Sequence, residues 1–213
     1  MKIVLATCGS RGDVQPMLAL ALGLQSRGHT VLLAGPPERK GWAEQLGCPY
    51  FPLGDDVTGF IDEISCAQEL RSAVEFISFV RRGVADQFAR LPAIIHGADL
   101  VVGSALNFAL ASLAESMGIA YRYIAFAPQL LASGEHPSPV IKSQELPRWL
   151  NHLPWLMNRL ADKIVMGPLI NDHRRRIGLK PVADAWHCIF GSKVIVSSDK
   201  AISSRLPAQV LNP

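Results

Sequence analysis

The chain has 213 residues, 49% of them hydrophobic, and a formal net charge of +3. This length and composition are enough to bury a substantial core, which excludes a disordered protein. The basic residues are spread along the chain except for three successive arginines at 174–176. We therefore expect no nucleic acid among its partners.

The four cysteines lie far apart, and none stands at metal-ligand spacing from another cysteine or a histidine. We expect reduced, mostly buried thiols and no metal site. The first apolar stretch is too short for a secretory signal, and the uncharged run at 100–114 falls short of the roughly 20 residues of a membrane-spanning helix. These features predict a cytoplasmic protein. The cysteines are Cys8, Cys48, Cys66 and Cys188.

The first 53 residues alternate between short apolar runs and amphipathic stretches. The apolar runs are continuous, as expected for strands of a parallel sheet that helices cover on both faces. Predicted strands lie at 3–6, 30–34 and 49–53, and predicted helices at 17–24 and 38–46.

The same alternation continues, and it predicts at least five strands in total. Residues 60–95 carry apolar side chains at helical spacing, which indicates one or two long helices. Strands are predicted at 99–103, 120–125 and 193–196, and a helix at 108–117. The fold class is therefore α/β, with a Rossmann-like parallel sheet flanked by helices on both faces.

Three later segments have a distinct composition. Residues 126–147 are rich in Pro, Ser and Gly and predict a lid or pocket wall. Residues 149–164 carry an aromatic and aliphatic stripe flanked by basic residues, which fits either a core-facing helix or a helix on a membrane surface. We expect 1–213 to form one domain, with 205–213 as the start of an interdomain linker.

A glycine-containing turn at 9–16 lies between the first strand and the first helix. Backbone N–H groups and the helix dipole there favour a polar or anionic ligand above the strand end. Asp13 would repel a phosphate but can accept a proton from a bound hydroxyl. It can also act as a helix N-cap, so both roles stay open. The turn lacks a dinucleotide fingerprint, and we expect no NAD or FAD.

Two further polar positions follow predicted strands. Asn107 comes after the fourth strand, where it either rims the same cleft or caps a helix. His136 lies beside Glu135 in the loop 133–139, which is either a solvated turn or a substrate contact. The arginines at 174–176 are predicted to form a solvated helix face.

Several of these motifs together resemble the N-terminal domain of GT-B glycosyltransferases. They are the segment 7–16 (TCGSRGDVQP), Gly28-His29, Ala127-Pro128 and 136–139 (HPSP), with support from 178–182 (GLKPV). The resemblance covers essentially the whole chain. It is greatest to the branch with sterol glucosyltransferases and bacterial enzymes that glycosylate antibiotics and lipids.

The resemblance implies an inverting enzyme with an acceptor-binding N-terminal half and a nucleotide-sugar half that follows it. Asp13 is implied as the general base. We expect Ser10, Arg11, Gly12, Asn107, Phe126 and His136 to contact the acceptor. The implied donor is UDP-glucose, held mainly by the second half, with no other cofactor. The implied acceptor is apolar and hydroxylated, such as a sterol, lipid or polyketide aglycone.

We expect the nucleotide-sugar half that the resemblance implies to be absent from this chain. We therefore expect the isolated chain to transfer nothing unless a nucleotide-sugar domain completes it, in cis or in trans. A non-catalytic binding or scaffold module is the alternative. An uncovered apolar docking face would also promote self-association of the isolated domain.

Overall fold

The computed structural model describes residues 1–60, 69–127, 131–132, 134, 136–138 and 146–198. Its centre is a six-stranded sheet in the order β3-β2-β1-β4-β5-β6, with every neighbouring pair parallel. The strand order reverses between β1 and β4, as in doubly wound folds that bind ligands at that point. The strands are β1 (Lys2–Cys8), β2 (Thr30–Gly35), β3 (Tyr50–Pro52), β4 (Leu100–Ala105), β5 (Ala120–Ala125) and β6 (Val194–Val196).

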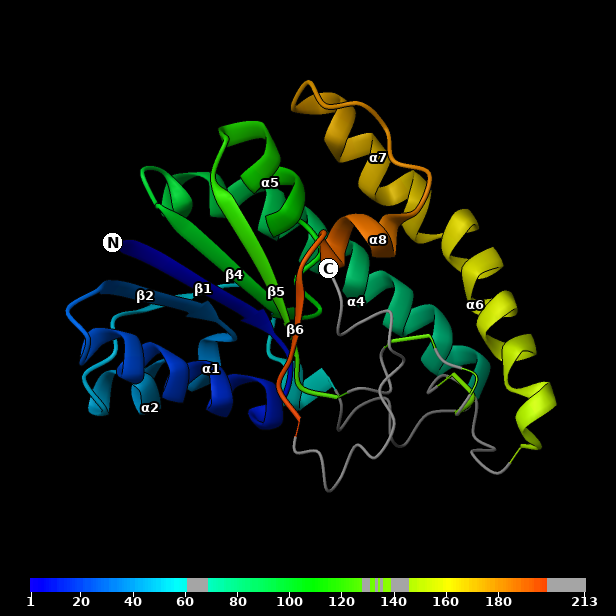
Figure 1. Cartoon of the computed structure of the whole chain (residues 1–213), viewed down its shortest axis with the longest axis horizontal. Helices are drawn as coiled ribbons and strands as arrows, with labels where there is room; N and C mark the ends of the chain where they lie inside the picture. The colour runs from blue at the N-terminus through cyan, green and yellow to red at the C-terminus, as the bar shows by residue number, and fades with distance from the viewer. Residues whose placement is uncertain (61–68, 128–130, 133, 135, 139–145, 199–213) are drawn as a thin grey trace.

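Helices cover both faces of the sheet, so the predicted fold class is confirmed (Figure 1). Helices α1 and α2 lie on one face, while α4, α5, α7 and α8 lie on the other. The α-helices are α1 (Arg11–Gln25), α2 (Lys40–Gln45), α4 (Glu69–Ile95), α5 (Leu110–Met117), α6 (His152–Ile164), α7 (Met166–Arg176) and α8 (Ala185–Phe190). Two 3-10 turns, η1 (Pro37–Arg39) and η3 (Arg148–Leu150), precede α2 and α6.

The apolar strands divide their side chains between two buried clusters. In β1, Ile3 and Leu5 join the cluster under α1 and α2. Val4 and Ala6 join the larger cluster under α4, α5, α7 and α8. Because successive side chains of a strand point to opposite faces, a strand covered on both faces must be apolar throughout. This is the reason that the continuous apolar runs predicted the strands.

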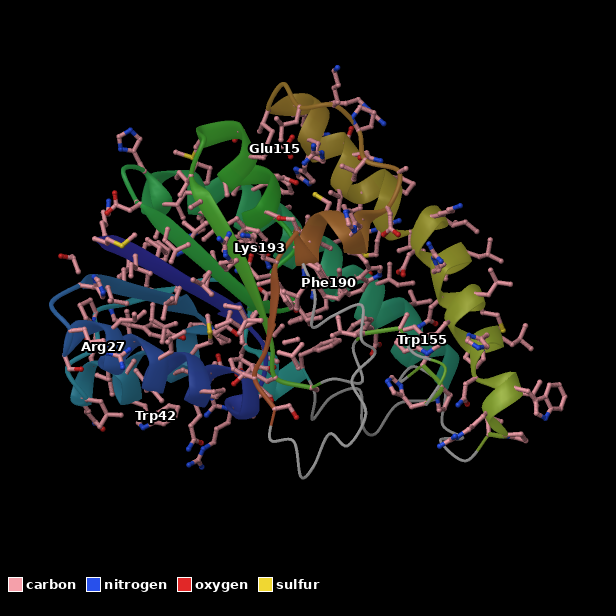
Figure 2. All side chains as sticks on the ribbon, viewed as in Figure 1. Arg27, Trp42, Glu115, Trp155, Phe190 and Lys193 are labelled. Atoms are coloured by element: carbon pink, nitrogen blue, oxygen red, sulfur yellow. The ribbon has the colours of Figure 1, made fainter. Side chains whose placement is uncertain are left out.

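The arginine cluster differs from its predicted solvated face at one position. Arg175 and Arg176 are exposed, but Arg174 is only 2% exposed. Its guanidinium donates to the carboxylate of Glu115 at 2.7 Å and to Ser112 Oγ at 3.0 Å. Glu115 belongs to α5 and lies near α7 (Figure 2). Arg174 therefore ties α7 to α5, and the predicted solvated role is wrong for this residue.

Two other predictions have definite outcomes. Cys8 and Cys48 are buried free thiols, as predicted, whereas Cys188 is partly exposed and Cys66 lies outside the described residues.

The apolar stripe at 149–164 does not enter the core, since its side chains point to solvent. The core-facing interpretation of that helix is therefore wrong. No helix in the described part of the chain has the length and apolar character needed to cross a bilayer.

Candidate functional site

The predicted turn lies at the carboxyl end of β1, where α1 begins. Ser10 is the N-cap of α1, and its Oγ accepts a hydrogen bond from the backbone N–H of Gly12 at 3.3 Å. The Asp13 carboxylate accepts from the backbone N–H of Ser10 at 2.9 Å. These two bonds form a capping box. Asp13 is thus the third residue of the helix, and its interpretation as the N-cap itself is wrong.

The Asp13 carboxylate is seated directly against the backbone of Gly9. A Cβ atom at position 9 would lie 2.2 Å from Asp13 Oδ2, far inside any van der Waals contact. Glycine is therefore required at position 9 by the carboxylate and not by an unusual φ angle, since Gly9 is not among the positive-φ glycines.

The two oxygens of Asp13 differ in their surroundings. Oδ2 accepts from both the backbone N–H and the hydroxyl of Ser10, at 2.9 and 3.3 Å. The hydrogen bonds of the Asp13 carboxylate within the described residues are those from Ser10, and Oδ1 takes part in none of them. Burial raises the pKa of Asp13 above its ordinary value, and the Ser10 hydrogen bonds only partly offset this. A carboxylate with a raised pKa and one unpaired oxygen is suited to accept a proton.

The negative charge of Asp13 affects the pKa of two nearby groups, the thiol of Cys8 and the hydroxyl of Tyr123. Burial raises the pKa of the Cys8 thiol to about 12, and the charge of Asp13 adds to this rise. Burial and the same charge also raise the pKa of Tyr123. The Tyr123 hydroxyl donates to the carbonyl of Ala105, at 2.9 Å. Both groups are therefore neutral near pH 7.

An aromatic cluster lies beside the same edge of the sheet. Phe60 stacks on Phe79 with ring centroids 4.1 Å apart and planes 8° apart, and Phe76 lies 6.4 Å from Phe60. Phe60 and Phe79 pack with Cys8, at the end of β1, and with Leu106, just after β4. Phe76 is 42% exposed, so part of this apolar wall is open to a ligand.

Asn107 follows β4 and is completely buried. Neither its side-chain nitrogen nor its oxygen has a hydrogen-bond partner among the described residues. It does not cap α5, so the helix-cap interpretation is wrong. The side-chain oxygen of Gln87, in α4, accepts from the backbone N–H groups of Phe108 and Ala109 at 2.9 and 3.1 Å. Sequence reasoning missed Gln87, because its partners lie about 20 residues further along the chain.

The hydroxyls of Thr7 and Ser104 are also buried and have no partner among the described residues. The two residues are register partners in β1 and β4. Asn107, just after β4, is a third buried residue with unpaired polar atoms. Buried polar atoms are nearly always paired, and a catalytic or binding role is one explanation for those that are not. Ala105, next in β4, has a φ of +52°, a strained backbone conformation for a residue with a Cβ.

The other predicted acceptor contacts, Arg11, Phe126 and His136, lie in different surroundings. Arg11 is exposed, with its guanidinium 5.7 Å from the ring of Trp42 and its Nε bound to Gln15. Phe126 follows β5 and packs partly buried against the cluster under α1. The structure therefore gathers the turn residues, Asn107 and Phe126 along the carboxyl edge of adjacent strands.

His136 belongs to a different neighbourhood. Its ring meets Trp155 of α6 edge-on at 5.8 Å, and its carbonyl accepts from Trp155 Nε1 at 3.0 Å. Pro137 and Ser138 are buried, so this segment is not a solvated turn. Glu135 lies outside the described residues. The recorded contacts of His136 join it to α6 and not to the Asp13 turn.

No group of three or more His, Cys, Asp or Glu side chains comes together among the residues that the structure describes. The acidic and polar groups at the site are instead arranged singly along the strand ends. The chemistry that this arrangement allows is proton abstraction from a polar ligand that rests on an apolar wall.

Comparison with known proteins agrees with this geometry. Residues 3–133 match the model of the glycosyltransferase family 28 N-terminal domain. The vancomycin aglycone glucosyltransferase of Amycolatopsis orientalis is 30% identical over 99% of this chain and 52% of its own length. The dTDP-epi-vancosaminyltransferase of the same organism is also 30% identical, over 99% of this chain and 49% of its own length. The chain therefore spans about half the length of the curated relatives it matches.

Solved structures show the same fold. The calicheamicin glycosyltransferase CalG4 superposes with a TM-score of 0.62 at 19% identity, covering 92% of this chain and 47% of that one. The glycosyltransferase VinC, solved in complex with dTDP, superposes with a TM-score of 0.61 at 17% identity, covering 93% of this chain and 49% of that one. The Rossmann-like sheet and its helices are thus those of the N-terminal half of a GT-B fold. The chain therefore belongs to glycosyltransferase family 28, whose N-terminal domain it matches.

Proposed function

We propose that the chain is the acceptor-binding half of an inverting glycosyltransferase that transfers a hexose from a nucleotide sugar to a hydroxyl of an apolar acceptor. The observation that carries this proposal is the Asp13 carboxylate. One of its oxygens is fixed by Ser10 and the other is unpaired among the described residues, at the carboxyl end of β1. That edge of a doubly wound sheet is the usual ligand-binding side.

In the proposed reaction, Asp13 Oδ1 accepts the proton of the acceptor hydroxyl as the hydroxyl oxygen attacks the anomeric carbon of the sugar. The bond between the anomeric carbon and the phosphate oxygen breaks, and the nucleoside diphosphate leaves with the bonding electron pair. Attack on the face opposite the leaving group inverts the anomeric configuration. The raised pKa of Asp13 strengthens it as a base, and the two Ser10 hydrogen bonds keep the carboxylate in place.

The apolar acceptor class is supported by the aromatic wall beside the turn. Phe76 and Phe60 present ring surface next to the end of β1, which suits a flat, mostly hydrocarbon ligand. A sterol, lipid or polyketide aglycone has this character. The similar proteins named above include an enzyme for the vancomycin aglycone, so aglycones of antibiotics belong in the same test.

UDP-glucose is the proposed donor, bound mainly by a nucleotide-sugar domain that joins this half in cis or in trans. One similar protein is named for a dTDP-sugar, and VinC was solved with dTDP. Both nucleotides should therefore be offered in any assay.

The decisive experiment measures nucleoside diphosphate release from UDP-glucose and dTDP-glucose with a panel of sterols, lipids and aglycones. It compares the chain alone, the chain completed with a donor half taken from a similar glycosyltransferase, and Asp13→Asn in both forms. Activity of the completed protein that Asp13→Asn abolishes supports the proposal. Activity that survives Asp13→Asn removes the base role, and acceptor binding without transfer in any combination favours the binding-module alternative.

A further inference from the structure

Helix α6 presents its apolar side chains to solvent. From η3 to the end of α6, six large apolar side chains are each more than half exposed, from 53% to 76%. They follow one another at helical spacing and so occupy one narrow face. We call this face the α6 stripe; its members are Trp149, Leu153, Leu156, Met157, Leu160 and Ile164.

The inward face of α6 is polar, which reverses the usual arrangement. The side-chain nitrogen of Asn151 donates to the carbonyl of Gly134 at 3.0 Å, and Trp155 Nε1 donates to the carbonyl of His136. Asn158 donates to the hydroxyl of Ser138. Figure 2 shows Trp155 on the side of α6 that faces the rest of the molecule. These hydrogen bonds join the inward face of α6 to the rest of the described structure, while the side chains of the stripe stay more than half exposed.

The charges around the stripe are asymmetric. His152, Arg159 and Lys163 lie along one flank, at positions i, i+7 and i+11. The acidic residue of α6, Asp162, lies on the inward face, where it accepts a hydrogen bond from Trp186. Arg159 has one distant ion pair, 3.8 Å from Asp184, and both side chains of that pair are well exposed. The outward face of α6 is therefore apolar with a basic margin.

We propose that the α6 stripe binds the surface of an anionic lipid membrane. The helix would lie in the plane of the interface, with the stripe among the acyl chains near the head groups and the basic flank at the level of the phosphates. Helix α6 forms one edge of the molecule, so it can meet a flat surface (Figure 1). This inference goes beyond the proposed transfer reaction and does not depend on it.

A second copy of the chain is a poorer fit to the same surface. If two α6 helices pair in antiparallel fashion, equivalent flanks meet, and His152, Arg159 and Lys163 face the same residues of the second copy. If they pair in parallel, the basic flank faces Pro154 and Ala161, which offer no negative charge. An anionic bilayer supplies both the apolar interior and the negative charge that the stripe and its flank require.

The test is flotation of the chain with vesicles of phosphatidylcholine, with and without one quarter phosphatidylglycerol. We expect binding to the anionic vesicles that weakens in high salt. Leu156→Glu should lower the partition coefficient at least about tenfold, because it places a charge in the part of the stripe that enters the bilayer. Leu46→Glu is the matched control, since Leu46 is similarly exposed, 49% against 55%, at the end of α2. Lys163→Gln should weaken binding to the anionic vesicles alone.

The emission of Trp149 gives an independent readout. Binding should shift the tryptophan emission to shorter wavelength, and Trp149→Phe should remove the shift. Far-UV circular dichroism checks that each variant is folded. Absence of vesicle binding, or equal loss with Leu46→Glu and Leu156→Glu, overturns the proposal. So does a dimer in analytical ultracentrifugation that Leu156→Glu dissociates, because the stripe then belongs to a second copy.

Discussion

The carboxylate of Asp13 accepts a hydrogen bond from the backbone N–H of Ser10 at 2.9 Å, while the hydroxyl of Ser10 caps the first turn of α1. One side chain thus closes a helix and offers a second oxygen to a ligand. The structural role of Asp13 and its proposed catalytic role are therefore separable by choosing the replacement. An amide oxygen can still accept the Ser10 hydrogen bond but is a very weak base.

Below about pH 4, where Asp13 is protonated, Asp13→Asn should leave the free energy of unfolding nearly unchanged, whereas Asp13→Ala should lower it by about 1 kcal/mol through loss of half the capping box. If Asp13 is the base, as proposed, both replacements should lower kcat of the donor-completed protein by about 10²- to 10⁴-fold. Urea denaturation and nucleoside diphosphate release measure the two effects. Equal activity of the Asn variant and the unmodified protein would limit Asp13 to its structural role.

Gly9→Ala tests the contact between the turn and the carboxylate. A Cβ atom 2.2 Å from Asp13 Oδ2 must displace that side chain, at a cost of about 1–3 kcal/mol in stability. Gly23→Ala, in the same α1 region, meets nothing within 4 Å and should be neutral or stabilise the protein by up to about 1 kcal/mol. Thermal unfolding of the two variants measures the difference. Similar melting temperatures would contradict the close approach at Gly9.

The pH dependence of stability follows from the raised pKa of Asp13. Since the folded state holds the proton more tightly than the unfolded state, the Asp13 contribution favours folding in acid and is lost as the pH rises through the folded pKa. Asp13→Asn removes this contribution. The stability of the Asn variant relative to the unmodified protein should therefore increase from about pH 4 upward, above the usual carboxyl pKa. Denaturation curves between pH 3.5 and 7 measure it, and a difference that stays constant or decreases over this range contradicts the raised pKa.

Replacing Arg174 should be far more harmful than replacing its neighbour. Arg174→Ala removes the guanidinium that donates to Ser112, to the carbonyl of Lys180 and to the half-exposed carboxylate of Glu115, which should cost about 1–3 kcal/mol. Arg175→Ala changes an exposed side chain with a 3.8 Å ion pair and should cost at most about 0.5 kcal/mol. Urea denaturation separates the two cases, and equal effects would show that Arg174 is not a structural tie.

The sequence predicted the features that depend on local patterns. The continuous apolar strands, the turn at Asp13 and the end of α5 at Gly118, where φ is +66°, all have local causes. Features set by distant partners could not be predicted. Arg174 follows a pattern typical of solvated helix ends, and its burial depends on Glu115, 59 residues away. The outward direction of the α6 stripe likewise depends on polar partners in the segment at 134–138, which no periodicity reveals.

Gln87 supplies the last test, because it joins α4 to the strand end that carries Asn107. Its oxygen accepts from Phe108 N–H and Ala109 N–H, and its nitrogen donates to the carbonyl of Leu106 at 3.0 Å. Gln87→Leu leaves these buried backbone groups unpaired and should lower stability by about 2–4 kcal/mol. Gln87→Glu keeps the acceptor for both N–H groups and should lose less.

Because these bonds also fix the backbone on either side of Asn107, Gln87→Leu should raise KM for the acceptor in the donor-completed protein more than it lowers kcat. A merely structural tie would change the melting temperature and leave KM unaltered. The comparison of Gln87→Leu with Gln87→Glu, by thermal unfolding and by acceptor titration, therefore decides whether the segment after β4 contributes to acceptor binding.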